Sequence, residues 1–263
     1  NQTYDTQIAI DRLGLNWQGN IDLRDLYIKD HHQDTLIYAG QLQTSILSFS
    51  NLLKTDVSLG YVTLSDTKLF IKTYKNEASD NMSVFSGKFN SGTKAASIFK
   101  LSADDVFINS SAIKITDQNL STPLLFDLTG VEASAQDFKI LGPDVFATIT
   151  SLGLTSKRGF EITGLSSQSS YTTEQMTLNN MKLQTSQSTL EGDVIMNYSA
   201  NGYSDFVNTV VFTASFKPSS IATNDLNGFY NEFGSNQTIG FKGDFKAFLN
   251  FLANFIFFSL ATL

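Results

Sequence analysis

Five segments of the chain share an apolar pattern that changes parity halfway along. They are IDLRDLYI (21–28), VTLSDTKLFI (62–71), FKLSADDVFI (99–108), VEASAQDFKI (131–140) and MTLNNMKL (176–183). Each has two mostly apolar residues two apart, an Asp or Asn near the middle, and two more apolar residues of the opposite parity. Because alternate residues of a regular strand share a face, an unbroken strand would turn the second pair outward.

This conflict is removed by an extra residue at a bulge or by a short turn, and Asp and Asn suit such a backbone. The segments are therefore predicted as kinked strands, or very tight hairpins, that keep one continuous apolar face. Their spacing of about 30 to 45 residues is typical of a quasi-repeating, solenoid-like sheet.

The remaining segments also favour strands. TLEGDVIMNYS (189–199) alternates, and NTVVFTASFKP (208–218) is predicted to end at Pro218. The only predicted helix lies within 219–233, with Thr223 or Asn224 as its cap, and 76–97 is predicted as a loop. With no convincing linker, the chain is predicted as a single unit, 1–263.

Composition narrows the class of protein. Three prolines, 12% aromatic and only 16% charged residues indicate an extensive β protein. A net charge of -7 argues against a role centred on nucleic acid or an anionic lipid surface. The absence of cysteine excludes disulfides, thiolate metal sites and a Cys nucleophile.

The only histidines, His31 and His32, lie in KDHHQDT beside Asp30 and Asp34. Imidazole and carboxylate both bind zinc, but such crowded donors fit a preformed site poorly, and no further His completes one. A solvated turn between strands is predicted instead. A Ser-His-Asp triad would have to use the same pair, and no nucleophile-elbow, phosphate-loop or dinucleotide motif is present. We therefore expect a protein that is not an enzyme, with no catalytic residue, metal or cofactor.

The most apolar stretch is FKAFLNFLANFIFFSLATL (245–263). A membrane span needs about 20 mostly apolar residues, and this stretch is interrupted at Asn250, Asn254, Ser259 and Thr262. As a strand, its odd positions, including Phe255, form an apolar face. It is predicted as strand, with a membrane or interfacial helix as the alternative.

Several motifs follow one another in an order that resembles a known family. LRDLYIKD is similar to a strand of the type l-x-d-v-x-v-x-d, and QDTLIYAGQLQTSI to the turn and strand gDTLlya-x-x-l. LLKTDVSLGYVTLSDTKLFI and the segment from SKRGFEITGL to GDVIMNY follow in the same order. The chain resembles the AsmA-like proteins of the double-membrane bacterial envelope, in particular the translocation-and-assembly-module TamB group.

The resemblance implies an all-β fold: a long, twisted, antiparallel-type sheet curled into an elongated hydrophobic groove, with one or two short helices. It implies a periplasmic protein, anchored to the inner membrane by an N-terminal helix absent from this chain. The implied function is non-enzymatic phospholipid transport between the inner and outer membranes. Because family members are usually several times longer, we expect a segment near the N-terminal end of a longer protein.

Two alternatives stay open beside lipid transport. One is a scaffold for outer-membrane protein assembly with a BamA/TamA-like partner, and the other is a secreted β-solenoid adhesin whose interior is closed by side chains. The expected partners are phospholipid acyl chains and a BamA/TamA-like outer-membrane protein, with no nucleic acid.

A kinked sheet with one apolar face needs something to cover that face. A second sheet covers it in a sandwich. In an open groove acyl chains do so, each buried CH₂ contributing about 0.8 kcal/mol. The residues predicted to line the face are Leu23, Leu26, Ile28, Leu64, Leu69, Ile71, Leu101, Val106, Ile108, Phe138, Ile140, Leu178, Met181, Leu183, Val194, Met196 and Phe255.

Overall fold

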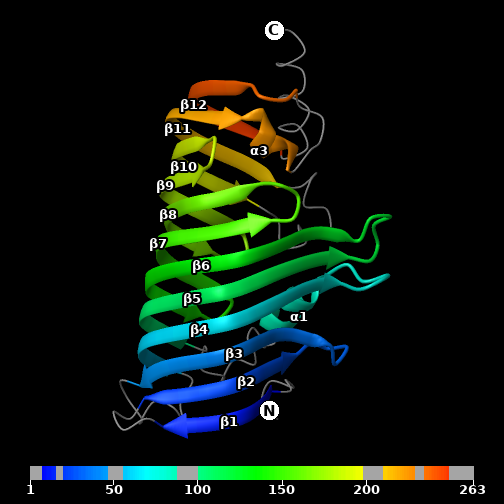
Figure 1. The fold of residues 1–263 in the computed structure, drawn as a ribbon, viewed down its shortest axis with the longest axis vertical. Coiled ribbons are helices and arrows are strands. Elements are labelled where there is room, and N and C mark those ends of the chain that lie inside the picture. The colour runs from blue at the N-terminus through cyan, green and yellow to red at the C-terminus, as the bar shows by residue number, and fades with distance from the viewer. Residues whose placement is uncertain are drawn as a thin grey trace. The chain divides into compact units, whose positions relative to one another are not determined.

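A computed structural model describes residues 8–15, 20–46, 56–87, 100–197, 210–228 and 234–248 of the protein. Within these ranges, twelve strands form one open, mixed sheet in which the strands follow one another in chain order (Figure 1). Two short helices accompany the sheet. The predicted all-β fold, a long sheet with one or two short helices, is confirmed.

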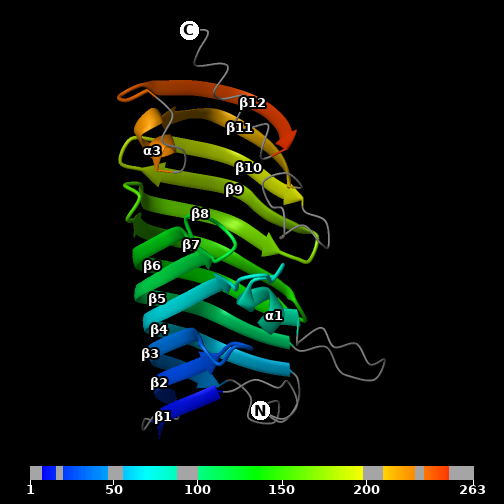
Figure 2. The same cartoon turned by 90° about the vertical axis from the view of Figure 1, so that its right-hand side faces the viewer.

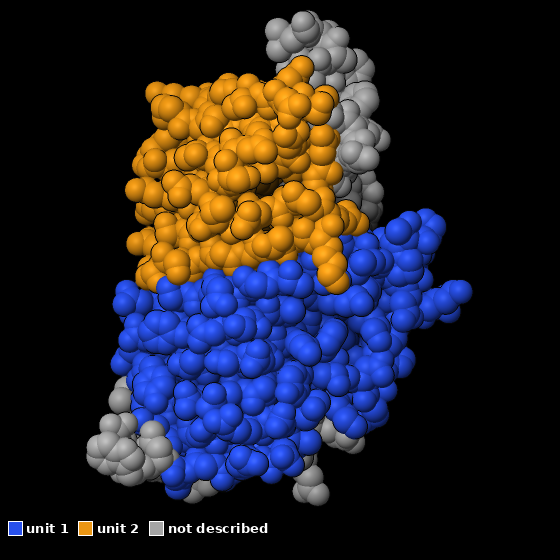
Figure 3. Space-filling model, in the orientation of Figure 1, with its two compact units in different colours: residues 1–147 blue, residues 148–263 orange. Residues whose placement is uncertain are grey.

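The chain divides into two compact units, residues 1–147 and 148–263 (Figure 3). Unit 1 contains β1 (Ile8–Leu15), β2 (Ile21–Lys29), β3 (Thr35–Ile46), β4 (Asp56–Thr73), α1 (Asn81–Gly87), β5 (Lys100–Asp117) and β6 (Leu124–Leu141). Strand β7 (Asp144–Ser156) begins in unit 1 and continues into unit 2. Unit 2 contains β8 (Glu161–Tyr171), β9 (Gln175–Thr185), β10 (Thr189–Asn197), β11 (Val211–Ala222), α3 (Thr223–Asn227) and β12 (Thr238–Phe248).

The pairs of strands whose register is described are antiparallel, with the exception of β4 and β5, which run parallel. The connection between these two contains α1, which packs against β4 (Figure 2). Asp80 caps α1, because its carboxylate accepts bonds from the Ser83 backbone N–H (2.8 Å) and hydroxyl (2.7 Å). The prediction that 76–97 is all loop was wrong at α1. The hydrophobic pattern does not reveal that Asp80 caps a helix here.

The repeated segments are kinked strands rather than hairpins, since each described copy lies inside a single strand: β2, β4, β5, β6 or β9. In four of them the central residue has the left-handed backbone conformation: Asp25 (φ 51), Asp66 (φ 53), Asp137 (φ 53) and Asn180 (φ 51). Asp and Asn adopt this conformation at lower cost than other non-glycine residues. The prediction that an Asp or Asn accommodates the parity switch is confirmed in these four copies.

Burial shows how the switch works in β2. Arg24 and Tyr27 are both exposed although their parity differs, while Leu26 is buried. A left-handed Asp25 between them therefore returns the second half of the strand to the same face. No residue is inserted here, because the pairing of β2 with β3 keeps one register from Arg24 to Leu26. Among the strand pairings whose register is described, a shift accompanies the switch only at Asn180, where β9 pairs with β8 and with β10.

Two predictions for unit 2 needed correction. Strand β11 does not stop at Pro218 but continues to Ala222. A register shift between Phe216 and Ser219 accommodates the proline, which has no N–H to donate to the ladder. The predicted helix is present as α3, but its capping residue is Ala222, which makes no side-chain capping bond, rather than Thr223 or Asn224.

Candidate functional site

The apolar residues of unit 1 form rows that cross several strands. Directly opposed residues of paired strands point to the same side of a sheet. One row consists of Leu23, Leu42, Leu64, Ile108 and Ala133. A second row consists of Ile28, Ile37, Leu69, Ile113 and Leu128. Shorter rows pair Leu26 with Ala39, Val62 with Val106, Ile71 with Ile115, Ala103 with Phe138, and Leu101 with Ile140.

All eleven residues predicted in unit 1 therefore belong to matched apolar rows, which we call the apolar face of unit 1. Only Leu26 among them is buried, and the other ten are half-buried. On β1, which forms one edge of the described sheet, Leu13 and Leu15 are 67% and 69% exposed. Partial exposure of so many aligned apolar side chains is unusual for a closed core, whose residues are mostly fully buried.

The predicted residues of unit 2 form a more compact group. Met181, Val194 and Ala214 are buried together, and Leu178, Leu183 and Met196 pack against them. This group, with its neighbours on β8 to β11, is the apolar cluster of unit 2. The structure thus brings together every residue predicted there except Phe255, which lies outside the described residues, as do residues 249–263 of the predicted C-terminal strand.

The opposite side of the strands is polar. In β6, Gln136, Asp137 and Lys139 are exposed, while Phe138 and Ile140 are half-buried. In β5, Phe107 is exposed, and its partners on the two neighbouring strands are the polar residues Thr63 and Ser134. This row lies directly beside the apolar row of Ile108. Among the described residues, one sheet and two short helices account for all the regular structure. No second sheet within those residues covers the apolar face.

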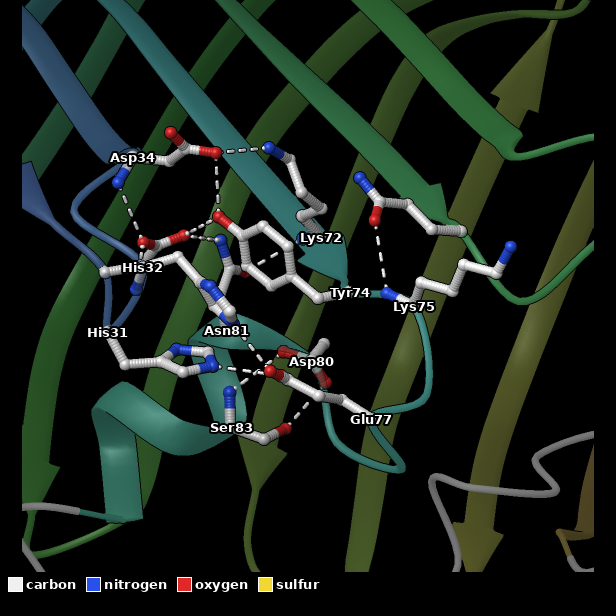
Figure 4. Close-up of polar contacts among 12 residues, drawn as sticks. His31, His32, Asp34, Lys72, Tyr74, Lys75, Glu77, Asp80, Asn81 and Ser83 are labelled. Atoms are coloured by element: carbon white, nitrogen blue, oxygen red, sulfur yellow. Dashed lines mark hydrogen bonds and ion pairs between the residues drawn. The ribbon is translucent and has the colours of Figure 1, made fainter.

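The turn between β2 and β3 carries a second group of candidate residues, which Figure 4 shows at close range. Nε2 of His31 lies 2.9 Å from Glu77 Oε2, and Nε2 of His32 lies 2.5 Å from Glu77 Oε1. The His32 ring stacks on Tyr74 at 3.8 Å between centroids, and the His31 ring meets the same tyrosine edge-on at 5.6 Å. The predicted solvated turn is confirmed, since both histidines are exposed.

Asp30 stabilises this turn through hydrogen bonds to its side chain. Its buried carboxylate accepts bonds from the N–H groups of His32 (2.9 Å) and Asp34 (3.0 Å), the Tyr74 hydroxyl (2.7 Å) and the Asn81 amide (2.9 Å). Burial by itself raises the pKa of Asp30, but the four hydrogen bonds outweigh it and lower the pKa below 3.8. Burial, and then the bonds to Asp30 and Asp34, raise the pKa of the Tyr74 hydroxyl.

Glu77 is the member of this group that sequence reasoning missed. Hydrogen bonds to His32 first and His31 second lower its pKa, so the carboxylate is the ionised acceptor for both rings. It lies 45 residues from His32 in the chain. The contact depends on how β2, β3 and β4 pair, and no local pattern at position 77 could reveal it.

A polar hollow of about 420 Å³ lies at the bend in β2 to β5, lined in part by Arg24, Asp66 and Lys68. Here the Tyr38 hydroxyl donates to Asp25 Oδ1 at 2.7 Å. That bond first, and burial second, raise the pKa of Tyr38 to about 12. The carboxylate of left-handed Asp25 is thereby tied to the neighbouring strand, which supports the bend.

Comparison of the chain with models of protein families and with curated proteins found no match. The resemblance to AsmA-like proteins therefore stays a proposal. No helix within the described part of the chain combines the length and the apolar character needed to cross a membrane.

Proposed function

We propose that the chain is a non-enzymatic β-sheet segment whose apolar face holds the acyl chains of phospholipids. In this proposal it lies in the periplasm and belongs to a bridge that supports phospholipid transport between the inner and outer membranes. The observation that carries the proposal is the apolar face of unit 1, with ten of eleven residues half-buried. Burying such surface against acyl chains contributes about 25 cal/mol per Å².

The one-sided character of the strands supports this proposal. Exposed Lys, Gln and Asp on the polar side of the sheet, which we call the outer side, suit an aqueous compartment. The apolar face on the other side offers aligned Leu, Ile and Val. Lipid tails need no directional partner, so an uninterrupted apolar surface is sufficient to hold them. The single-residue bends let that surface continue along each strand.

The test replaces one residue of the apolar face by a charged one. Ile108→Asp places a carboxylate in the central row, where desolvation against lipid costs several kcal/mol. Phe107→Asp is the matched control, because it places the same charge on the outer side one residue away. Lipid would be extracted from each purified protein and quantified by mass spectrometry, with thermal unfolding measured in parallel.

We expect the wild-type protein and Phe107→Asp to carry phospholipid, and Ile108→Asp to remain folded and lose most of it. Met181→Asp extends the test to the apolar cluster of unit 2. A wild-type protein without lipid, together with an unfolded Ile108→Asp, would show an ordinary closed core, since burying an unpaired charge there is strongly destabilising. That result would favour the adhesin class.

The edge strand β1 favours assembly of outer-membrane proteins as a second candidate function. Its apolar residues Ile8, Ile10, Leu13 and Leu15 are 44% to 69% exposed, and it has one paired neighbour in the described sheet, β2. A client strand adding to this edge would gain main-chain hydrogen bonds and cover the side chains. A photoactivatable residue at Leu13 should then crosslink to client β-hairpins, and recovery of lipid adducts alone would reject this function.

A further inference from the structure

The cluster at the β2–β3 turn offers three metal-binding donors from two separate segments. One donor atom each from His31, His32 and Glu77 lies within 4.8 Å of the others, and the two imidazole–carboxylate distances are 2.9 and 2.5 Å. Around zinc, His nitrogen and carboxylate oxygen lie at about 2.0–2.2 Å, so neighbouring ligands of a tetrahedral site are about 3.3 Å apart. Modest side-chain rotations therefore bring all three donors to one ion.

The backbone that carries these donors is already ordered. Asp30 holds the turn through its two backbone N–H partners, and Gln33 completes the turn in the left-handed conformation (φ 65). The Glu77 N–H donates to the Tyr74 carbonyl (3.0 Å), and the Glu77 carbonyl accepts from the Asn119 amide (3.0 Å). Because folding already fixes the backbone of the ligands, metal binding loses less conformational entropy.

Charge around the cluster also suits a cation. Asp30, Asp34 and Glu77 contribute three carboxylates, and the one at Asp34 is paired with the ammonium group of Lys72 at 2.6 Å. Figure 4 shows Lys72 and Asp34 on the opposite side of the Tyr74 ring from Glu77. The ionised Glu77 carboxylate puts a negative charge at the donor atoms themselves, which attracts a divalent ion.

We propose that His31, His32 and Glu77 bind one divalent transition-metal ion, of which zinc is the representative example. Two imidazole nitrogens and a carboxylate oxygen suit zinc and its neighbours in the series better than magnesium or calcium, which prefer oxygen ligands alone. Each histidine binds through Nε2, so the ion replaces the two bonds to Glu77.

The ion joins two places that hydrogen bonds, the Lys72–Asp34 ion pair and the contact of the histidine rings with Tyr74 also bring together. His31 and His32 lie in the turn between β2 and β3, and Glu77 follows β4. Metal binding therefore clamps the β2–β3 hairpin to the end of β4, and it leaves a coordination position for water or a ligand from a partner. This role is independent of whether the apolar face holds lipid.

The experiment uses the full chain, stripped of metal with a chelator and titrated with Zn²⁺ by calorimetry at neutral pH. Thermal unfolding is recorded with and without Zn²⁺, and Co²⁺ absorption reports the ligand geometry. The variants are His31→Gln with His32→Gln, and Glu77→Gln, which keep side chains of similar size. Glu174→Gln is the control, since it removes an exposed turn carboxylate in unit 2.

We expect the wild-type protein and Glu174→Gln to bind one Zn²⁺ and to melt at a higher temperature with it. Both cluster variants should bind more than about tenfold more weakly, the size of effect seen for altered metal ligands and their supports, while melting like the wild-type protein without metal. Equal zinc binding by all four proteins, or none by the wild-type protein, would overturn the proposal. If the double histidine variant fails to fold, Glu77→Gln decides.

Discussion

Replacing Asp30 by Asn tests how strongly one buried carboxylate holds the β2–β3 turn. Asp30 is 5% exposed as a residue, and its carboxylate accepts four hydrogen bonds, two on each oxygen. An Asn keeps the size but replaces one oxygen by an NH₂ group, so two donors lose their acceptor whichever way the amide turns. Facing Tyr74, the amide can donate to the hydroxyl, which still donates to Asp34, but the NH₂ group of Asn81 then meets another donor.

The magnitude follows from these contacts. A hydrogen bond to a charged group contributes about 1.5–3 kcal/mol, and a buried donor without a partner costs about 1–3 kcal/mol. We therefore expect Asp30→Asn to lower the free energy of unfolding by about 2–4 kcal/mol, measured by urea denaturation at neutral pH with an unchanged slope. Asp104→Asn, at an exposed position of β5, should change it by less than about 0.5 kcal/mol.

The pH dependence gives a second check. Because the pKa of Asp30 is below 3.8 in the folded protein, the unfolded chain binds the proton more readily. The stabilisation is present above pH 3.8 and is lost as the pH falls through the lowered folded pKa. The difference between wild type and Asp30→Asn should therefore shrink in acid. A loss under about 1 kcal/mol at neutral pH, or a difference that grows in acid, would refute this account of the turn.

Two further predictions concern the bend in β2 to β4. A Cβ added at Gly40 meets the Cβ of Asp66 at 3.0 Å, so Gly40→Ala should cost about 1–3 kcal/mol in urea denaturation. Adding Asp66→Gly should recover part of this loss and adding Asp137→Gly should not; equal effects would contradict the contact. For Tyr38, with a pKa raised to about 12 by its bond to Asp25, stabilisation is present below about pH 10 and lost as the pH rises to about 12. Subtracting the ultraviolet tyrosinate titration of Tyr38→Phe from that of the wild type should show a transition near pH 12, and one near pH 10 would disprove the bond.

The bends could be predicted from sequence because both of their signals are local. A parity change in the apolar residues and a central Asp or Asn are visible within ten residues, and Asp25, Asp66, Asp137 and Asn180 adopt the conformation they suggest. The copy in β5 is the exception. Its parity also switches between Ala103 and Val106, but the described left-handed residue of that strand is Ser110. Opposite Asp104, it is Asp137 of β6 that has the left-handed conformation.

The features that sequence reasoning missed depend on contacts between distant segments. Strands β4 and β5 pair in parallel, and alternation within a strand gives no information about strand direction. Pro218 lies inside β11 because the register shifts beside it. Glu77 approaches the histidines only once β2, β3 and β4 have paired. A motif search within a few residues of His31 therefore finds two donors and stops short of the third.

Alignment of the bends across strands explains how the described sheet keeps one apolar face continuous. In register, Asp25 of β2 faces Gly40 of β3, which faces Asp66 of β4, which lies beside Ser110 of β5. Three of these four residues have left-handed backbones and the fourth is a glycine. A slip of one residue would turn the apolar rows outward and also move an ordinary residue into a left-handed position, at a cost of roughly 1–2 kcal/mol. The same residues thus fix the register and carry the apolar face across the bend, which is the continuity that the proposed binding of acyl chains requires.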